Sequence, residues 1–270
     1  MKGEDRLLNM DNKKSVDVGN VWWFWFSTNA FAVDKRLRHV LRVMPRDPRC
    51  KFCNAPFQGI GGMIVRALFG KRRSALNPRY CNLCEIASQE FPGGAEVEMS
   101  MLFADVRGST ALSETMSPTE FSQLINRFYT AATKIIIDED GLVEKLAGDS
   151  VAAFWGAGFA GPDYVGRTIK VAQNLQKAME RQNISIGIGV HSGVAYFGAM
   201  GAADGLTEIS AIGDEVNLAA RLASKAAAGE IIVSEQALKK AKIDVSEMEA
   251  RSLELKGISE PVTVRVMHGS

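Results

Sequence analysis

Apolar and polar positions alternate most regularly in the run VEMSMLFADV, residues 97–106. Apolar side chains recur at every second position from Val97 to Phe103, and Asp105 then interrupts the run. A period of two predicts a half-buried strand. The sequence therefore predicts a strand whose exit carries a carboxylate, with Gly108 shortly after it.

The pattern from residue 117 onward alternates between helical and extended periods. Residues 118–137 place apolar side chains at helical spacing, and Ser117, Pro118 and Glu120 form a helix start signal. Runs at 142–146 and 151–155 predict a hairpin with its turn at Ala147-Gly148-Asp149. The further expected elements are a helix at 163–181, a strand at 184–194, a loop at 198–205, a strand at 207–212, a helix at 214–226, and strands at 231–233, 251–255 and 262–267. This order predicts an α+β fold, a mixed-sheet sandwich of ferredoxin-like type.

The sequence pattern changes at the segment Phe91-Pro92-Gly93-Gly94, where we expect a domain boundary. We expect three parts: an N-terminal segment at 1–33, a small basic module at 34–92 and the α+β domain at 96–270. The net charge of +1 is unevenly distributed, because residues 34–80 hold twelve Lys or Arg and two acidic residues. These basic residues lie among Pro and Gly without a recognition helix, so we expect no nucleic-acid binding.

The longest apolar patch, VWWFWFSTNAFAV at residues 21–33, has thirteen residues and is too short to span a bilayer. Two interpretations stay open. The aromatic side chains pack against the protein or a partner chain, or they contact a membrane surface beside Lys35, Arg36, Arg38 and Arg42. The polar start of the chain shows no secretory signal, so we expect a cytoplasmic protein, with membrane association as the alternative.

Four cysteines form two CxxC pairs, Cys50 and Cys53 in RCKFC, and Cys81 and Cys84 in YCNLC. Each pair places two sulfur atoms within reach of one ion, and two pairs complete a tetrahedral shell. The pattern predicts a four-cysteine metal site, with structural zinc favoured and an iron–sulfur cluster still open. Disulfides or free thiols are the third interpretation, and a reducing compartment disfavours the disulfides. Between the pairs, residues 63–73 predict one short helix.

Asp105 at the strand exit and Asp149 in the hairpin turn are candidate ligands of a hard cation. Mg²⁺ takes few carboxylates from the protein and uses substrate phosphates for other positions. The alternative is that Asp105 caps the next helix and Asp149 is an ordinary turn residue.

Five motifs in order carry a family resemblance. They are FADVRGST, EKLAGDSVAAFWG, IGIGVHSGVAYFG, ISAIGDEVNLAARLAS and LELKGISEPV. Together they resemble the catalytic domain of class III nucleotidyl cyclases, from Val97 to Met267. The resemblance implies a cyclase domain at 96–270.

The resemblance implies a two-metal reaction. Two Mg²⁺ or Mn²⁺ ions per active site would bind Asp105, Asp149 and the main-chain carbonyl of Val106, while Gly108 lets the chain approach the phosphates. The ribose 3′-hydroxyl attacks the α-phosphorus, and pyrophosphate leaves.

The resemblance also implies a second set of residues on the helix at 214–226. Asn217 and Arg221 are four positions apart and share one helix face. They correspond to the pair that orients the ribose and stabilises charge on the transferring phosphorus. Lys256 in the LKG turn corresponds to a lysine that contacts the phosphates.

The resemblance also indicates which purine base is recognised, through a Lys–Ser pair that resembles a subclass often found in bacteria. Lys145 corresponds to the purine-recognising lysine of adenylyl cyclases, and Ser210 stands at its partner position. A guanylyl cyclase would typically carry Glu in place of Lys145, because a carboxylate accepts hydrogen bonds from guanine. ATP is therefore favoured over GTP. One departure is that residues 199–208 contain no Lys or Arg, where many relatives have a basic residue for the triphosphate.

In this family the metal aspartates come from one chain and the other groups from a second chain, so a homodimer with shared active sites is implied. We expect an adenylate cyclase that makes cyclic AMP for intracellular signalling. The alternatives are a guanylate cyclase, a non-catalytic nucleotide-binding protein, and a redox- or metal-sensing protein centred on the cysteines.

Overall fold

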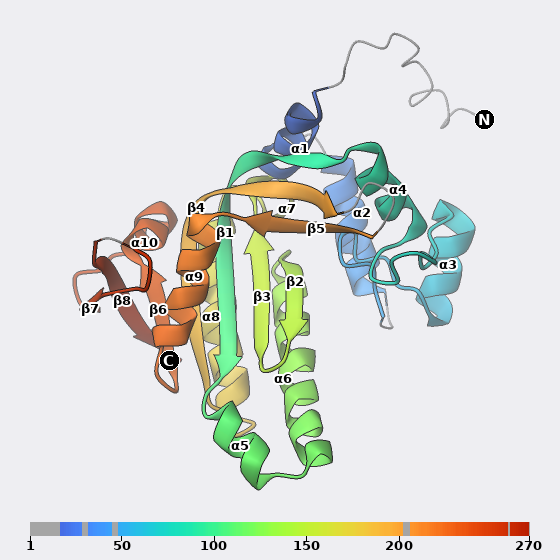
Figure 1. Ribbon diagram of the computed structural model, residues 1–270. Coiled ribbons are helices and arrows are strands. Elements are labelled where there is room, and N and C mark those ends of the chain that lie inside the picture. The colour runs from blue at the N-terminus through green and yellow to red at the C-terminus, as the bar shows by residue number, and fades with distance from the viewer. Residues whose placement is uncertain (1–16, 29–31, 45–47, 202–205, 259, 270) are drawn as a thin grey trace.

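A mixed sheet forms the centre of the molecule, with helices on both faces (Figure 1). The computed structural model describes residues 17–28, 32–44, 48–201, 206–258 and 260–269. Within these residues the sheet has eight strands. They are β1 (Gly93–Val106), β2 (Leu142–Ala147), β3 (Ser150–Trp155), β4 (Ile186–Gly201), β5 (Thr207–Ile212), β6 (Glu230–Ser234), β7 (Glu249–Leu253) and β8 (Val262–His268).

The described helices divide between the N-terminal part and the crossovers of the sheet. They are α1 (Val18–Ser27), α2 (Ala32–Val43), α3 (Gly59–Phe69), α4 (Asn82–Glu90), α5 (Ser109–Thr115), α6 (Pro118–Asp138), α7 (Ala157–Ala160), α8 (Tyr164–Glu180), α9 (Asp214–Lys225) and α10 (Glu235–Ala241). The strand order is β2-β3-β1-β4-β6-β8-β7, and β5 pairs with β4. The elements β1, α6, β2, β3, α8 and β4 form the predicted ferredoxin-like arrangement, which is confirmed.

Side chains of β1 alternate between two hydrophobic cores, so the strand is buried on both faces and not on one as the period of two predicts. Leu102 and Ala104 face the core that contains α6 and α8. Val97, Met99 and Met101 face the opposite core, which also contains buried residues of α1, α2 and the cysteine region. The N-terminal part therefore packs directly on the sheet.

Local signals define α6 closely. The Ser117 side chain accepts a hydrogen bond from the Glu120 amide at 3.3 Å, and the Glu120 carboxylate accepts one from the Ser117 amide at 2.9 Å. This capping box satisfies two amides that the helix itself leaves unpaired. The predicted range 118–137 differs from the observed helix by one residue.

Three predicted boundaries are wrong. The expected loop at 198–205 begins too early, because β4 continues to Gly201 and pairs with both β1 and β5. Gly198 allows β4 to lie close to β1, since a Cβ there would lie 2.3 Å from the Gly94 Cα. Residues 202–205 lie outside the described part. The helix expected at 63–73 is α3, which starts at Gly59 and ends at Phe69, with Gly70 as its C-cap at a φ of 63°. The strand expected at 251–255 starts and ends two residues earlier, as β7.

In helix α1, part of the aromatic patch at residues 21–33 packs against the protein. Trp22 and Phe26 are 1% and 2% exposed. The Trp22 indole N–H donates to the Phe91 carbonyl at 2.9 Å, and the Phe26 ring lies 4.3 Å from that of Phe197. Trp23 and Phe24 expose about half of their surface, at 49% and 47%. Residues 29–31 of the patch are outside the described ranges.

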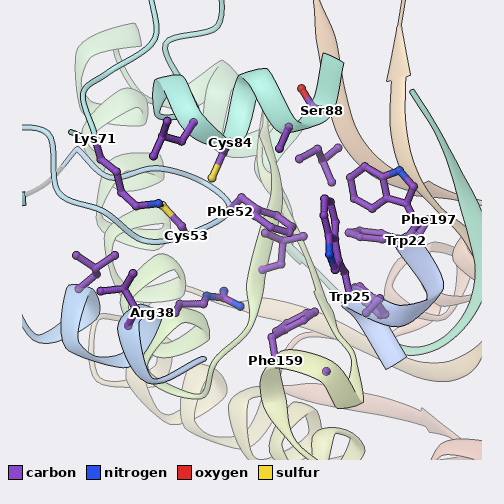
Figure 2. A pocket seen from close by; sticks show the side chains of 18 residues that line it. Trp22, Trp25, Arg38, Phe52, Cys53, Lys71, Cys84, Ser88, Phe159 and Phe197 are labelled. Carbon is purple, nitrogen blue, oxygen red and sulfur yellow. The ribbon is translucent and has the colours of Figure 1, made fainter. Parts of the chain in front are cut away.

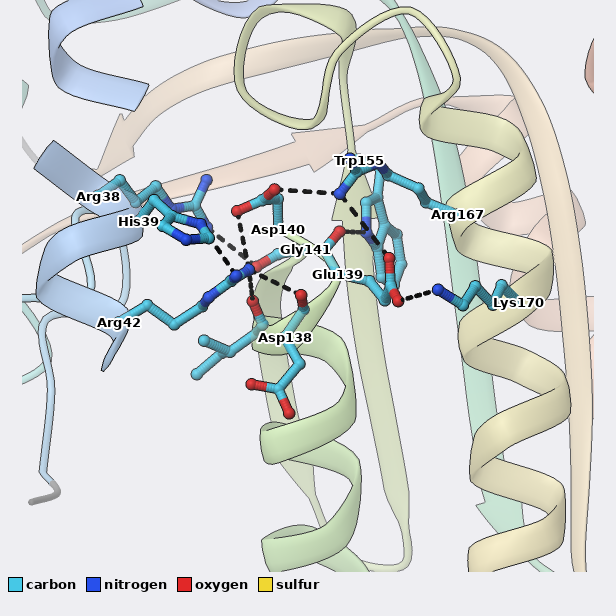
Figure 3. Close-up of polar contacts among 11 residues, drawn as sticks. Arg38, His39, Arg42, Asp138, Glu139, Asp140, Gly141, Trp155, Arg167 and Lys170 are labelled. Carbon is cyan, nitrogen blue, oxygen red and sulfur yellow. Dashed lines mark hydrogen bonds and ion pairs between the residues drawn. The ribbon is translucent and has the colours of Figure 1, made fainter. Parts of the chain in front are cut away.

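Two arginines of α2 bind the end of α6 (Figure 3). Arg42 donates to the carbonyls of Ile137 and Asp138 at 3.2 and 2.7 Å, and Arg38 donates to the Gly141 carbonyl at 2.9 Å. Cations are favoured here because the last carbonyls of a helix carry partial negative charge. Arg38 and Arg42, which the membrane-surface alternative placed beside a bilayer, are thus engaged inside the protein. Across the described ranges, none of the helices combines the length and the apolar character that a membrane crossing requires.

Candidate active site

Asp105 and Asp149 lie at the same end of the sheet. Asp105 is the penultimate residue of β1 and pairs with Ser150, the first residue of β3. The Val106 amide donates to the Asp149 carbonyl at 3.0 Å, which ties the exit of β1 to the hairpin turn. The structure therefore brings together three predicted metal-binding positions, Asp105, Val106 and Asp149.

Two glycines shape the backbone beside these aspartates. Gly108, the N-cap of α5, and Gly148, in the hairpin turn, have φ values of 69° and 60°. A Cβ atom at either glycine would meet no described atom within 4 Å. Both glycines are thus required for backbone conformation, and the space above them is open.

The donor set fits a divalent cation. The Asp105 Oδ1 atom is buried, and apart from one ion pair it has no partner among the described residues. Its charged neighbour is the guanidinium of Arg107, with which it forms an ion pair. Carboxylate oxygens in an open, partly dry position are ligands that Mg²⁺ and Mn²⁺ take.

Three neighbouring residues are part of this region although the sequence did not assign them individual roles. The Ser109 hydroxyl donates to the Asp149 carboxylate. The Tyr129 hydroxyl donates to the Gly148 carbonyl at 2.8 Å, and burial together with the charge of Asp149 raises the pKa of Tyr129. Arg107 reaches across to the Ala223 carbonyl at 2.8 Å, and its burial lowers its pKa. Residue type alone carried no signal for these contacts.

Helix α9 presents the second predicted set. Asn217 is exposed, and Arg221 lies near the β7–β8 connection, where its Nη2 would be 3.4 Å from a Cβ placed on Gly257. Arg221 and Lys256 are therefore neighbouring positions. Among the described contacts, none joins the side chains of Asn217 or Arg221 to Asp105 or Asp149.

Contacts with β4 hold α9 in place. The helix backbone approaches the strand at Gly189, where a Cβ would lie 2.2 Å from the Ala223 amide nitrogen. Buried His191 pairs with Ser234 at 2.7 Å and contacts the Glu215 carboxylate. Burial lowers the pKa of His191, against the opposing effect of Glu215. His191 thus links β4 to Glu215 of α9, the helix that carries Asn217 and Arg221.

Ser210, the predicted partner of Lys145, contacts the residue beside that lysine. The Ser210 hydroxyl donates to Glu144 Oε1 at 2.6 Å, and Lys145 is exposed. A β-bulge between Val143 and Lys145 places Glu144 out of regular pairing. In Figure 1, β1 bends so that β5 passes close to β2, which brings Ser210 and Glu144 together.

The cysteine region covers the free edge of β5. The Ile209 amide donates to the Tyr80 hydroxyl at 3.0 Å, and Lys51 donates to the Ile209 carbonyl at 3.2 Å. Asn77 donates to the Thr207 carbonyl at 3.1 Å. These side chains satisfy backbone groups that an edge strand leaves unpaired. The region that holds the cysteines is therefore in direct contact with the strand that carries Ser210.

Lys51 extends this contact to β2. Its Nζ lies 2.8 Å from Glu144 Oε2 and also pairs with Glu208. Tyr80 donates to Glu208 at 3.1 Å, and burial raises the pKa of Tyr80, so its hydroxyl keeps its proton. Lys51 stands between Cys50 and Cys53, so the ion pair starts within the first CxxC.

The four cysteine sulfurs of Cys50, Cys53, Cys81 and Cys84 lie within 4.8 Å of one another. The separation between Cys53 Sγ and Cys81 Sγ is 3.7 Å. Four thiolates at about 2.3 Å from one ion stand about 3.8 Å apart in a tetrahedron. The Lys71 ammonium lies 3.7 Å from Cys53 Sγ; burial opposes its charge, but the thiolates raise its pKa. The arrangement fits one tetrahedral ion.

Comparison with known proteins agrees with these features. Residues 94–268 match the family described as the adenylate and guanylate cyclase catalytic domain. The chain is 30% identical over 138 residues to an adenylate cyclase of Anabaena cylindrica, covering 46% of this chain and 26% of that protein. It is 29% identical over 149 residues to adenylate cyclase 1 of Rhizobium meliloti, covering 51% and 22%. The chain thus spans about a quarter of these relatives.

Two solved structures share the fold. The adenylyl cyclase CyaB from P. aeruginosa is 28% identical with a TM-score of 0.58, covering 65% of this chain and 96% of that one. The guanylyl cyclase Cya2 is 25% identical with a TM-score of 0.60, covering 64% and 93%.

Proposed function

Because the chain belongs to the adenylate and guanylate cyclase catalytic domain family, we propose that it is an adenylate cyclase that converts ATP to cyclic AMP and pyrophosphate. The observation that supports a catalytic role is the placement of Asp105 and Asp149 together at the exit of β1, with open space above Gly108 and Gly148. The product would act in intracellular signalling.

In this proposal Asp105, Asp149 and the Val106 carbonyl hold two Mg²⁺ or Mn²⁺ ions. When bound, these ions activate the 3′-hydroxyl and offset the charge of the triphosphate. Ser109 orients the Asp149 carboxylate through its hydrogen bond, and Tyr129 fixes the turn. The open backbone at Gly108 leaves room for phosphate oxygens.

The remaining groups act on the nucleotide. Arg221 would stabilise negative charge on the transferring phosphorus, because a guanidinium stays charged and binds phosphate through two donors. Asn217 orients the ribose, and Lys256 contacts the phosphates. Lys145 donates to acceptor atoms of adenine, with Ser210 beside it. The lysine at this position supports ATP as the substrate.

We also propose that the protein works as a homodimer with two shared active sites. The support is that the Asn217 and Arg221 side chains make no described contact with the aspartates of their own chain. In a dimer, one chain would supply Asp105 and Asp149 and the other would supply Arg221. Asp105→Ala and Arg221→Ala proteins, each inactive alone, should then regain activity on mixing. Two folded, dimeric variants that stay inactive together would refute the shared site.

The cysteine region in this proposal holds one zinc ion. Sulfur separations within 4.8 Å support a mononuclear site, because an iron–sulfur cluster inserts several ions between the thiolates and needs wider spacing. Stoichiometric zinc with no visible absorption band after anaerobic purification is the expected result. A visible iron–sulfur band would overturn the zinc assignment.

The direct test of the activity measures cyclic AMP and cyclic GMP from ATP and GTP, with Mg²⁺ and separately with Mn²⁺. We expect cyclic AMP from the wild type and a loss of at least about 100-fold in Asp149→Asn, since even outer-shell changes cost 10–100-fold. The matched control is Asp163→Asn, because Asp163 is exposed and its side chain makes no capping hydrogen bond.

The substrate result separates the alternatives. Cyclic GMP as the main product would replace adenylate by guanylate cyclase activity. No cyclic product from a folded protein with either metal would refute catalysis and leave a nucleotide-binding role.

A further inference from the structure

A cavity of about 250 Å³ lies where α1, α2 and the cysteine region meet the sheet (Figure 2). Its walls are mostly apolar and rich in aromatic rings. The aromatic wall residues are Trp22, Trp25, Phe26, Phe52, Phe159 and Phe197. None of the residues assigned to catalysis or to nucleotide binding lines this cavity in the described part of the chain.

Arg38 is the polar group that makes this cavity more than a packing defect. The residue is 8% exposed, and Figure 2 shows its side chain reaching from α2 toward Phe52 and Phe159. Its Nη2 donates to the Gly141 carbonyl, and its guanidinium lies 4.9 Å from the centre of the Phe159 ring. No described atom accepts a hydrogen bond from its Nε. A buried donor without an acceptor is costly, so a ligand that supplies one is favoured.

The charges at the cavity favour an anionic group. The described wall residues include two cations, Arg38 and Lys71, and no carboxylate; the wall also holds Cys53 and Cys84, whose thiolate charge faces Lys71 and the proposed zinc ion. Lys71 is already held against Cys53 Sγ at 3.7 Å, on the side of the thiolates. Asp140, the carboxylate whose charge acts on Arg38, is shared by Arg42 at 3.2 Å and Arg167 at 3.1 Å. Arg38 is therefore the cation that can receive a carboxylate.

The volume limits the ligand to a small molecule. An engineered apolar cavity of about 150 Å³ binds benzene, and most ligand pockets hold 300 Å³ or more. A cavity of about 250 Å³ therefore accepts a ligand somewhat larger than one aromatic ring. Apolar walls with few polar groups are the usual lining of such sites.

We propose that this cavity is a binding site for a small apolar monocarboxylate, whose carboxylate pairs with Arg38 and whose apolar part lies among the aromatic rings. The site is separate from the proposed catalytic residues. It is connected to them because Leu142 of β2 and Ile209 of β5 also line the cavity, and Ser210 follows Ile209. A bound acid would thus contact both strands that carry the base-selecting pair.

The test titrates the full-length, metal-loaded protein with octanoate and with 3-phenylpropionate by calorimetry and tryptophan fluorescence. Trp22 and Trp25 lie in the wall, so binding should change their emission. Octan-1-ol, which lacks the charge, is the ligand control. We expect saturable binding of at least one acid below about 1 mM, and binding of octan-1-ol about tenfold weaker or more.

Two variants locate the site. Arg38→Met should weaken acid binding about tenfold or more, whereas Arg36→Met, which removes an exposed cation from the same helix, should leave it unchanged. Ala87→Leu fills the cavity from α4 without touching Arg38 and should abolish binding, which decides the matter if Arg38→Met does not fold.

Three outcomes would overturn the proposal. They are no saturable binding of either acid, equal binding of octan-1-ol, or unchanged affinity in a folded Ala87→Leu protein. None of these measurements uses cyclase activity, so the cavity and the catalytic proposal fail independently.

Discussion

Lys51→Met should destabilise the protein strongly, although Lys51 is a single lysine in a cysteine loop. Its side chain is only 6% exposed and lies between the carboxylates of Glu144 and Glu208, whose side chains are 12% and 35% exposed. Methionine keeps the length of the side chain and removes the charge. Glu144 would then be left buried with the Ser210 hydroxyl as its described partner.

The size of the effect follows from the burial of Glu144. Removing one partner of a buried ion pair costs about 3–5 kcal/mol, because the remaining charge stays away from water. We expect about 3 kcal/mol, at the lower end, since Glu208 is more exposed and keeps contacts with Tyr80 and Arg79. A loss of this size lowers the melting temperature by about 6–12 °C in a protein of this length.

The assay is urea unfolding followed by circular dichroism, with Lys134→Met as the matched control. Lys134 pairs with Asp138, but the two side chains are 75% and 51% exposed. Exposed pairs of this kind contribute about 0.3–0.5 kcal/mol, so the control should unfold almost as the wild type does.

The double variant Lys51→Met/Glu144→Gln tests whether the loss comes from the buried ion pair. Neutralising Glu144 removes the unpaired charge, so the double variant should recover much of the loss and give a coupling energy above about 1 kcal/mol. If Lys51→Met costs no more than Lys134→Met, or the two changes simply add, the buried ion pair does not hold the cysteine region on β2 and β5.

Three further outcomes are expected. Cys84→Ser should lose bound zinc by elemental analysis and unfold at lower urea than wild type, because metal binding contributes directly to folding. Burial lowers the pKa of His191 from its usual 6.5, so below pH 6.5 the unfolded state binds more protons than the folded state. The free energy of unfolding should therefore be highest above pH 6.5 and should decrease as the pH falls below that value. In His191→Asn this decrease should be smaller. Phe26→Ala should cost about 3–5 kcal/mol by urea unfolding, whereas Phe24→Ala, half exposed at 47%, should cost under about 1 kcal/mol.

The local elements of the main domain were predictable because their signals are local. The capping box of α6 and the period of two in β1 each lie within a few consecutive residues. The adjacency of Asp105 and Asp149 also follows, because a strand exit and a hairpin turn meet at one edge when β1 and β3 pair. The end of β4 could not be predicted from the sequence. Glycine is a typical loop residue, but Gly198 lies within the strand, where its missing side chain allows β1 to approach closely.

The sequence by itself determined the α+β arrangement, the carboxylate pair, the cysteine cluster and the family, because each depends on residue type and spacing. Only the tertiary structure decided that Lys51 joins β2 to β5, that Ser210 bonds to Glu144, and that Arg38 faces a cavity. These contacts join positions far apart in the chain: 66 residues separate Ser210 from Glu144, and 157 separate Lys51 from Glu208. No local pattern encodes them, because the bend of the sheet and the packing of the N-terminal helices bring those side chains together.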